Sequence, residues 1–290
     1  MAFQLLKGKP LSERMLKTIE KDVSDLKKSG IIPHIVAIQI GQNASSQIYM
    51  TQQKKTCEKA DVIYEVQEFN QNVSLEEVSY SIGKMNNDKR ITGIILQRPV
   101  PKNLEVHQLQ SKISPDKDVE GIHPVNLGNL NYARTKIYPP TAAAVVDLLK
   151  SCEPDLKGKQ VTIISHSDIV GKPLAMMLLQ SEYGSPTVTV CHIATRDLKQ
   201  HTSNADILIS AAGVSQLIRK DMVKKDAIVI DVGINPAGTG TNKLITGDVD
   251  FENVKDICSY ITPVPGGVGP VTVTMLLRNL IECGKKQASL

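Results

Sequence analysis

The chain has 290 residues, which allows one large domain or two ordinary ones, and its 41% hydrophobic and 22% charged residues are typical of a globular protein. The net charge of +4 is spread along the sequence, and there is no Trp and only three Phe, so neither a basic block nor an aromatic platform for nucleic acid is indicated. No apolar run reaches the roughly 18 residues of a membrane span, and the first residues lack the apolar core of a secretory signal.

The cysteines are odd in number, widely spaced, and not clustered with histidines at the spacings of zinc ligands. This pattern indicates reduced thiols in a reducing compartment, so we expect a cytoplasmic protein without a metal site. The cysteines are Cys57, Cys152, Cys191, Cys258 and Cys283.

The first part of the chain alternates helical and strand patterns. Apolar residues recur at helical spacing from Leu11 to Leu26, and Gly30 ends that segment. Ser74 and Glu77 form a capping box that opens a later helix. Short apolar or alternating runs predict strands at 35–40, 62–69 and 93–96, and a polar helix is expected at 44–60.

Residues 112–140 are rich in loop formers and end in Tyr138-Pro139-Pro140, which places a domain boundary there. A helix is expected from Thr141 to about Leu149. Strands are then expected at 161–164, 187–191, 207–210 and 228–232, with helices between them. This rhythm predicts an α/β fold whose second domain is a doubly wound parallel sheet with helices on both faces.

The first strand of the second part leads through Ser165-His166-Ser167 into a helix that starts near Gly171, as in the first βα unit of a nucleotide-binding domain. A pyrophosphate would lie at that helix N-terminus. The glycine fingerprint is absent, and no Asp or Glu follows the next strand, near His192, to bind a ribose hydroxyl. Small residues end the later strands, at 211–213 and at Gly233, and leave room for a ligand. The alternative is an α/β domain without a ligand.

The stretch 261–276 combines a tight loop with a helix start. Pro263-Val264-Pro265 lacks two amide donors, and Gly266-Gly267 permits positive φ, so the loop exposes its backbone. Pro270 lies near the first turn of the following helix. Read locally, the stretch is either a loop that approaches a ligand or a connector to a buried C-terminal helix.

Four motifs in this order give the chain a resemblance to one family. They resemble the bifunctional 5,10-methylenetetrahydrofolate dehydrogenase/5,10-methenyltetrahydrofolate cyclohydrolases, and the likeness covers essentially the whole chain. The motifs are Gly-Ile-Ile-Leu-Gln-x-Pro-x-Pro at 93–101, Pro-x-Lys-Asp-Val-x-Gly at 115–121, Ser-x-x-Val-Gly-Lys-Pro at 167–173, and the stretch 261–276.

The resemblance implies an NADP-dependent oxidoreductase and hydrolase, a multifunctional enzyme of one-carbon metabolism that makes 10-formyltetrahydrofolate for purine biosynthesis. It implies an N-terminal α/β folate domain made of residues 1–140 and 272–290, a Rossmann domain made of residues 141–271, and a cleft between them that takes the tetrahydrofolate substrate. It also implies a homodimer formed through the nucleotide domain.

Site residues carry over from the family motifs one by one. Tyr49 matches the tyrosine that stacks near the pterin, and Gln97 matches the glutamine beside the reactive centre. Pro265, Gly266, Gly267 and Val268 match the loop that lines the folate site. The cofactor residues implied are Ser165, His166, Ser167, Ile169, Val170, Gly171, His192, Ala211, Gly213 and Ile234.

The chain departs from the family at the catalytic lysine. Where the family has Tyr-x-x-x-Lys, Tyr49 is followed four positions later by Gln53, so the glutamine lies on the helix face of the lysine. A glutamine can orient water but cannot take a proton at neutral pH. Lys54 lies one residue on, about 100° round the helix, and would need a change of register to replace the lysine.

Two further departures concern binding. The second carboxylate of the family's Lys-Asp-Val-Asp-Gly loop is Glu120 here, one methylene longer, so its charge-assisted grip on the pterin requires the loop or the ligand to shift. The family arginine and serine that hold the NADP 2′-phosphate are replaced by His166 and Ile193, and whether the nearby Arg196 compensates stays open. NAD therefore stays an alternative to NADP.

Together these residues predict a dehydrogenase that keeps hydride transfer, because that step depends on positioning rather than on a protein acid or base. They predict a weak or absent cyclohydrolase step, with Gln53 as the reason. The alternatives are a fully bifunctional enzyme with another base such as Lys54, a non-catalytic folate- or nucleotide-binding paralogue, and, more distantly, a two-domain dehydrogenase such as one that acts on shikimate.

Overall fold

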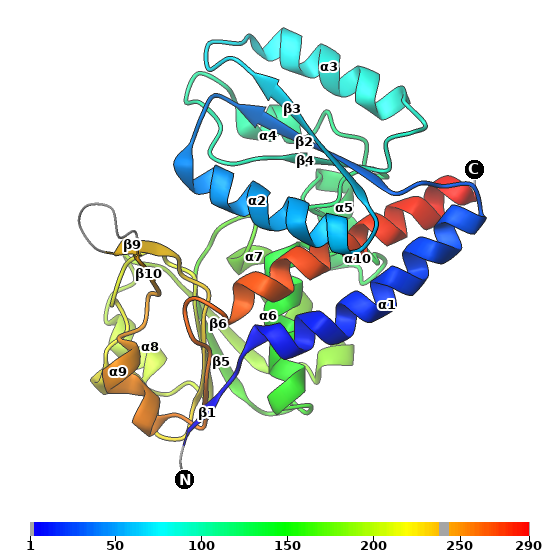
Figure 1. Cartoon of the computed structure of the whole chain (residues 1–290). Coiled ribbons are helices and arrows are strands. Elements are labelled where there is room, and N and C mark those ends of the chain that lie inside the picture. Colours follow the sequence, from blue (N-terminus) through cyan, green and yellow to red (C-terminus); the bar gives the residue numbers. More distant parts are fainter. Residues whose placement is uncertain (1–2, 238–243, 290) are drawn as a thin grey trace. The chain divides into compact units, whose positions relative to one another are not determined.

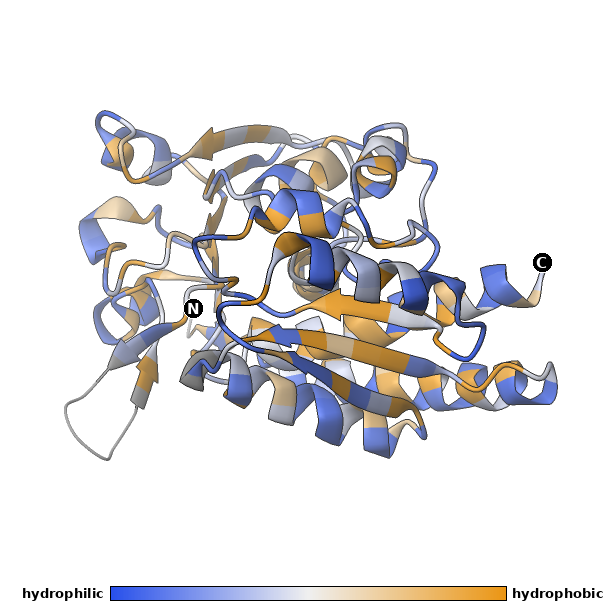
Figure 2. Ribbon diagram, turned by 90° about the horizontal axis from the view of Figure 1, so that it is seen from above, coloured by the Kyte–Doolittle hydropathy of each residue, from blue (hydrophilic) through white to orange (hydrophobic). Residues whose placement is uncertain are grey.

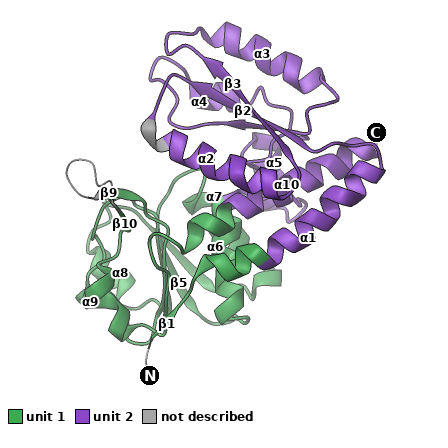
Figure 3. Ribbon diagram, in the orientation of Figure 1, with its two compact units in different colours: residues 1–13, 141–272 green, residues 14–140, 273–290 purple. Residues whose placement is uncertain are grey.

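The computed structural model describes residues 3–237 and 244–289, in which helices alternate with parallel strands (Figure 1). The predicted α/β fold with a doubly wound parallel sheet is confirmed. The chain forms two compact units, coloured separately in Figure 3. Unit 1 comprises Met1–Glu13 and Thr141–Thr272, and unit 2 comprises Arg14–Pro140 and Val273–Leu290.

The two units differ from the expected division at the N-terminus. The expected first domain included residues 1–13, whereas the structure groups them with unit 1. The reason is a strand pairing, because β1 (Gln4–Leu5) runs parallel to β11 (Tyr260–Ile261) at the edge of the larger sheet. Strands of two residues carry no periodicity, so the sequence could not predict this pair.

Unit 2 is built on a three-stranded parallel sheet in the order β3-β2-β4. Its strands are β2 (His34–Ile40), β3 (Ile63–Phe69) and β4 (Gly93–Leu96). Its helices are α1 (Gly8–Lys28, which begins in unit 1), α2 (Ala44–Lys59), α3 (Leu75–Asn87), α4 (Val106–Gln110) and α5 (Pro124–Asn131). The expected strands and helices of this part are present within one to three residues of their predicted bounds.

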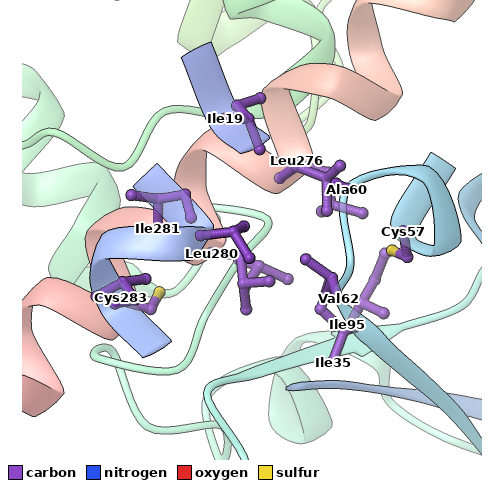
Figure 4. Packing of buried hydrophobic residues seen from close by; sticks show 14 of the residues in the cluster. Ile19, Ile35, Cys57, Ala60, Val62, Ile95, Leu276, Leu280, Ile281 and Cys283 are labelled. Carbon is purple, nitrogen blue, oxygen red and sulfur yellow. The ribbon is translucent and has the colours of Figure 1, made fainter. Parts of the chain in front are cut away.

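The sheet of unit 2 separates two hydrophobic cores, because successive residues of a strand point to opposite faces. On β2, Ile35 and Ala37 belong to a core that includes residues of α1, α2 and the C-terminal helix, while Val36 and Ile38 belong to a core that includes residues of α3. Figure 4 shows the first core, in which residues of the sheet such as Ile35 pack with residues of the helices. Burial on both faces explains why the strands read as short apolar runs.

The start of α3 is fixed as the capping box predicts. The Ser74 hydroxyl accepts a hydrogen bond from the amide of Glu77 at 3.1 Å, which satisfies one of the amide groups that the first turn leaves without a partner.

Unit 1 holds a six-stranded sheet in the order β1-β11-β8-β7-β5-β6, and every neighbouring pair is parallel. The chain runs from β5 to β6 on one side and then to β7 on the other side of β5. In open sheets of this kind ligands bind outside the carboxyl ends of the strands at the point where the order reverses, which here is between β5 and β7.

The remaining elements of unit 1 frame this sheet. Its other strands are β5 (Gln160–Ile164), β6 (Thr187–Cys191), β7 (Ile207–Ser210) and β8 (Ile228–Asp231), with the antiparallel pair β9 (Asn235–Ala237) and β10 (Leu244–Thr246). Its helices are α6 (Pro140–Cys152), α7 (Gly171–Leu178), α8 (Leu198–Thr202), α9 (Phe251–Val254) and the start of α10 (Val268–Ala288), with 3-10 turns at Ser181–Tyr183, Lys220–Met222 and Lys255–Ile257.

Hydropathy follows this architecture. The strands are largely apolar, whereas the helices alternate apolar and polar residues (Figure 2). Over residues 3–237 and 244–289, no helix combines the length and apolarity that a membrane crossing requires.

Candidate active site

Gln53 is the centre of a side-chain network in unit 2. It lies on α2 and is buried, with a relative exposure of 7%. Its carbonyl oxygen Oε1 accepts hydrogen bonds from Gln97 Nε2 at 2.8 Å and from the Tyr64 hydroxyl at 2.7 Å. The structure therefore brings Gln53 and Gln97 into direct contact across 44 residues of sequence. Tyr64, on β3, is a member of this network that the sequence analysis missed.

The helix face of Gln53 also carries Tyr49, one turn earlier. Tyr49 is 39% exposed, and partial burial raises the pKa of its phenol. The neighbouring Lys54 and Lys55 are exposed, so they lie off the buried face that Gln53 occupies. Lys54 therefore does not share the buried position of Gln53.

Glu120 lies beside the end of β4. Residue 118 bridges to Ile94 on this edge strand, and the Ile94 amide donates to the carbonyl of Lys117 at 2.7 Å. Glu120 Oε2 then accepts the amide of Leu96 at 3.3 Å, next to Gln97. Burial, and secondly the nearby Asp118 carboxylate, raise the pKa of Glu120 to about 7 against the opposing effect of Arg98. At neutral pH Glu120 is therefore poised between its acid and its carboxylate.

Asp118 shapes the loop that presents Glu120. Its buried carboxylate accepts the amides of Glu120 at 3.2 Å and His123 at 2.7 Å. The side-chain amides of Asn126 and Gln110 donate to it at 2.9 and 3.3 Å. Burial raises the pKa of Asp118, while these donors favour its charged form. We assign this motif residue to loop structure rather than to ligand binding.

Lys117 and Asn279 fix the same loop from its two sides. Lys117 Nζ donates to the carbonyls of Met85 and Asp88 at the end of α3, at 2.9 and 2.7 Å. On α10, Asn279 Nδ2 donates to the carbonyls of Val119 at 2.8 Å and Tyr138 at 2.7 Å. The loop is thus held by its own Lys117 on the end of α3 and by Asn279 of the C-terminal helix.

The proline–glycine loop lies in unit 1 and leads into α10. Gly266 has φ of 105°, as the sequence predicts, and its carbonyl accepts the amide of Gly8 at 2.9 Å. Gly267 has a different requirement, because a Cβ there would lie 2.7 Å from the carbonyl oxygen of Pro263. Pro265 and Val268 flank these glycines, and Val268 begins α10. The loop therefore has a folded, close-packed backbone rather than that of a loose connector.

The turn after β5 has the predicted form. The Ser167 hydroxyl accepts the amides of Val170 at 3.2 Å and Gly171 at 3.4 Å, while the Ser165 hydroxyl donates to Ser167 at 3.2 Å. These bonds to the amides are long, so an anion could compete for them at the start of α7. Ile169 is partly exposed within the turn.

Two histidines extend this surface from β5 to β6. The rings of His166 and His192 stack with their centroids 4.9 Å apart and an interplanar angle of 21°. His192 Nδ1 accepts the amide of Ala194 at 3.2 Å, which orients its ring. The topology thus joins two residues that the sequence suggested separately.

The turn after β7 lies at the same edge of the sheet as the turns after β5 and β6. Ala211 donates its amide to the carbonyl of Ile164, at the end of β5, at 3.1 Å, so residues 211–213 lie beside the turn at Ser165. Gly213 is exposed, and Ile234, after β8, is 45% exposed. Behind them lies the buried Asp248, which the sequence analysis missed because it is far along the chain from this turn.

The donor chemistry of these surfaces suits organic ligands. Within the described ranges 3–237 and 244–289, no three His, Cys, Asp or Glu residues gather in a way that could hold a metal ion. These candidate residues instead offer amides, hydroxyls and carboxyls, and each unit contributes some of them.

Comparison with known proteins shows what the chain is similar to. The model of the "tetrahydrofolate dehydrogenase/cyclohydrolase, catalytic domain" matches residues 6–120, and that of the "tetrahydrofolate dehydrogenase/cyclohydrolase, NAD(P)-binding domain" matches residues 139–288. The bifunctional protein FolD of Sulfurimonas denitrificans is 43% identical over 286 residues, which are 98% of each chain.

Two solved structures are similar throughout. The bifunctional FolD of Campylobacter jejuni is 42% identical with a TM-score of 0.93, and the match covers 98% of this chain and 99% of that one. The Trypanosoma brucei enzyme, solved with NADP cofactor and an inhibitor, is 32% identical with a TM-score of 0.93, over 99% and 98% of the two chains. The chain therefore belongs to the tetrahydrofolate dehydrogenase/cyclohydrolase family.

Proposed function

We propose that this protein oxidises 5,10-methylenetetrahydrofolate to 5,10-methenyltetrahydrofolate with NADP, or with NAD, and that its cyclohydrolase step is weak or lost. The observation that carries the proposal is the state of Gln53. It occupies the helix face of the family lysine, is buried, and has its carbonyl oxygen bound by Gln97 and Tyr64. Dehydrogenase activity on this substrate belongs to one-carbon metabolism, whereas the hydrolase activity of the family would be kept only in part.

Hydride transfer is compatible with this arrangement. The nicotinamide, when bound, accepts the hydride from the one-carbon bridge of the folate. The protein has to hold the two within about 3–3.5 Å and in alignment, which accounts for most of the rate in such steps. No side chain has to take up a proton, so replacing the lysine with a neutral amide leaves this step possible.

Hydrolysis of the methenyl cation makes the opposite demand. Water must lose protons as the tetrahedral intermediate forms and collapses, and a positioned base contributes about 10²–10⁴-fold to such steps. Gln53 cannot take a proton, and its carbonyl oxygen already accepts two hydrogen bonds. Lys54 is exposed off this face, which speaks against its acting as a replacement base.

On the folate side we assign Tyr49, Gln97 and Glu120 to substrate binding, together with Pro265, Gly266, Gly267 and Val268. Glu120 supports this because its carboxyl accepts the amide of Leu96, the residue before Gln97, and has a pKa raised to about 7. A carboxyl group whose pKa is near 7 can accept a hydrogen bond as the carboxylate or donate one as the acid. Both forms suit the amide and amino groups at the edge of a pterin.

On the nucleotide side we assign the turn 165–171, the stacked His166 and His192, Ala211, Gly213 and Ile234 to the dinucleotide. These groups lie at the carboxyl ends of β5, β6, β7 and β8, where doubly wound sheets bind ligands. The long hydrogen bonds that Ser167 accepts leave the start of α7 available to phosphate.

We also propose a homodimer formed through unit 1. Strand β6 is the edge of the six-stranded sheet, and Val190 on it and Ile193 just after it are 45% and 67% exposed. An exposed apolar edge is a surface that a second copy would cover. Sedimentation equilibrium should give a dimer for the native chain and a monomer for Val190→Asp. A native monomer would contradict this part.

A cytoplasmic location completes the proposal. All five cysteines are free thiols, and four of them are buried, which suits a reducing compartment. Recovery of the protein in an exported fraction of its own cells would contradict this location.

The test is a spectrophotometric assay that starts from methylenetetrahydrofolate with NADP or NAD and follows reduced nicotinamide and the methenyl product separately. The proposal predicts reduction of at least one cofactor, with methenyl product that accumulates. Methenyl product that vanishes as fast as it forms would mean a full bifunctional enzyme. No reduction with either cofactor would favour a non-catalytic binding paralogue.

A further inference from the structure

The turn after β7 is built around one carboxylate. Asp248 is fully buried, and its oxygens accept three successive amides: Ala212 at 2.7 Å, Gly213 at 3.2 Å and Val214 at 3.0 Å. Successive amides that converge on one point form an anion-binding concavity. In this chain the anion is the protein's own side chain.

Two side chains hold the same carboxylate in place. The Ser210 hydroxyl donates to Asp248 Oδ2 at 3.0 Å, and Asn235 Nδ2 donates to Oδ1 at 2.9 Å. A Cβ at Gly233 would overlap the carboxylate, so the chain approaches it closely on that side as well. Five hydrogen-bond donors and a close backbone contact thus hold the Asp248 carboxylate in a single orientation.

A second buried carboxylate holds the segment that carries Asp248. Asp231 accepts the amide of Asp248 at 3.0 Å and that of Val249 at 2.9 Å. The amide of Asp231 donates to the Thr262 hydroxyl at 2.7 Å, immediately before the proline–glycine loop. The turn after β7 and the start of that loop are thus fixed to one buried centre.

This arrangement decides which groups the turn can offer to a ligand. The amides of residues 212–214 face Asp248, and the amide of Ala211 donates to Ile164. Among the described residues, no hydrogen bond is accepted by the carbonyl oxygens of residues 211–213. Gly213 and Val214 are exposed, so a ligand can reach the turn. It would meet acceptors, and a phosphate, which also has only acceptors, would not bind there.

We propose that Asp248 is a positioning residue of the dinucleotide site, which turns the amides of residues 212–214 inward and presents carbonyl oxygens to a hydroxyl or amide donor of NAD(P). The inference rests on the proposed function, which assigns this turn to the dinucleotide. It deepens that function, because it separates a donor-binding turn at 211–214 from a phosphate-binding turn at 165–171.

The experiment compares Asp248→Asn with the native protein by titration calorimetry, using NADP, NAD and inorganic pyrophosphate as ligands. An asparagine keeps the volume but can accept the amides with one oxygen only. The affinities for NADP and NAD should fall by a similar factor of about ten or more, equal to about 1.4 kcal/mol. The affinity for pyrophosphate should not fall, and the KM of the folate should stay within about twofold.

Asp221→Asn is the matched control in the same unit, because Asp221 is exposed and pairs only with Lys199 at 2.7 Å among the described residues. Ser210→Ala is the second variant, which removes one donor to Asp248 and keeps the turn's amides. It should weaken the binding of NADP about threefold, as expected for the loss of one hydrogen bond. If Asp248→Asn does not fold, the NADP affinity of Ser210→Ala tests the inference in its place.

Three outcomes would overturn the inference. The first is unchanged NADP affinity in folded Asp248→Asn, or in Ser210→Ala where the first variant does not fold. The second is a loss of pyrophosphate affinity as large as that for NADP. The third is a native protein that binds neither dinucleotide, and this outcome alone would also refute the proposed function.

Discussion

Gln53 in unit 2 and Asp248 in unit 1 are both buried polar centres, but they are held in different ways. Gln53 is a neutral amide whose carbonyl oxygen is bound by two side chains, Gln97 and Tyr64. Asp248 is a carboxylate bound by three backbone amides and two side chains. One centre is made of exchangeable side chains, and the other is made largely of the backbone itself.

This difference distinguishes a centre that can change its chemistry from a centre that holds the backbone in position. A centre bound by side chains can change its reactivity through one substitution, since the backbone around it does not depend on it. A centre bound by the backbone cannot change without moving the turn that it holds. We infer that the lysine position could be lost while the dinucleotide turn was kept, and the following predictions test this contrast.

The largest expected effect is a gain of cyclohydrolase activity. Gln53→Lys places an amine beside Gln97 and Tyr64, where burial favours its neutral, basic form. Hydrolysis of methenyltetrahydrofolate should rise by about a hundredfold or more, as general base catalysis allows. Stopped-flow absorbance of the methenyl group measures it.

Lys54→Ala is the control for that experiment, because Lys54 is the neighbouring lysine on the exposed side of the helix. Its rates should stay within about twofold of the native rates. A large loss of hydrolysis in this variant, or no gain in Gln53→Lys, would contradict the proposal that Gln53 weakens the hydrolysis step.

A stability change of intermediate size is expected at the loop that carries Glu120. Asn279→Ala removes the side-chain donor to the buried carbonyl of Val119 and to the partly buried carbonyl of Tyr138. The free energy of unfolding should fall by about 1–3 kcal/mol, which is the cost of leaving one buried carbonyl without a hydrogen bond. Urea denaturation measures this.

The exposed Asn204, which donates to the carbonyl of Gln200, is the matched asparagine for this test. Asn204→Ala should change stability by less than about 0.5 kcal/mol. Equal effects of the two variants would contradict the role that we give to burial at Asn279.

The pH dependence of stability should reveal the titration of one buried carboxyl group in each unit. Burial raises the pKa of Glu120 and that of Asp231 to about 7 in the folded protein, far above their unfolded values. The folded state therefore binds more protons than the unfolded state between about pH 4 and 7, and unfolding free energy falls as the pH rises through this window.

Glu120→Gln and Asp231→Asn should each flatten this decline by about 1–2 kcal/mol between pH 5 and 7. Urea unfolding at several pH values measures the slope. Parallel slopes in the native protein and both variants would contradict the raised pKa values of these groups.

The smallest expected effect concerns Tyr64. Tyr64→Phe removes one of the two hydrogen bonds to Gln53 and leaves the bond from Gln97. Stability should fall by about 0.5–1.5 kcal/mol, and the dehydrogenase rate should stay within about twofold. Tyr80→Phe, at a tyrosine that is 67% exposed, is the control and should change stability less. A larger loss of rate than of stability would give Tyr64 a part in the reaction.

Sequence reasoning reached the elements with strong local signals. The runs at 35–40 and 93–96 are strands, and Ser74 caps its helix, because apolar runs and capping boxes act within a few residues. The spacing from Tyr49 to Gln53 placed the glutamine on the face that meets Gln97. The roles of these residues in catalysis stay predictions.

What the sequence missed depends on contacts between distant segments. Tyr64 approaches Gln53 only because β3 packs beside α2, and Asp248 reaches Ala212 across 36 residues. The pairing of β1 with β11 joins residues 4–5 to residues 260–261, more than 250 positions away. Local periodicity carries no record of such pairings, so the buried polar contacts appear only in the fold.

The most direct test of the central claim supplies methenyltetrahydrofolate alone, without any nicotinamide, to the purified native protein and follows its absorbance. If Gln53 has removed the base, the methenyl group should decay at the rate of buffer without protein, while the same preparation still reduces NADP or NAD from methylenetetrahydrofolate. Decay that scales with protein concentration and far exceeds the buffer rate would contradict the account, because it would show that hydrolysis proceeds without the family lysine.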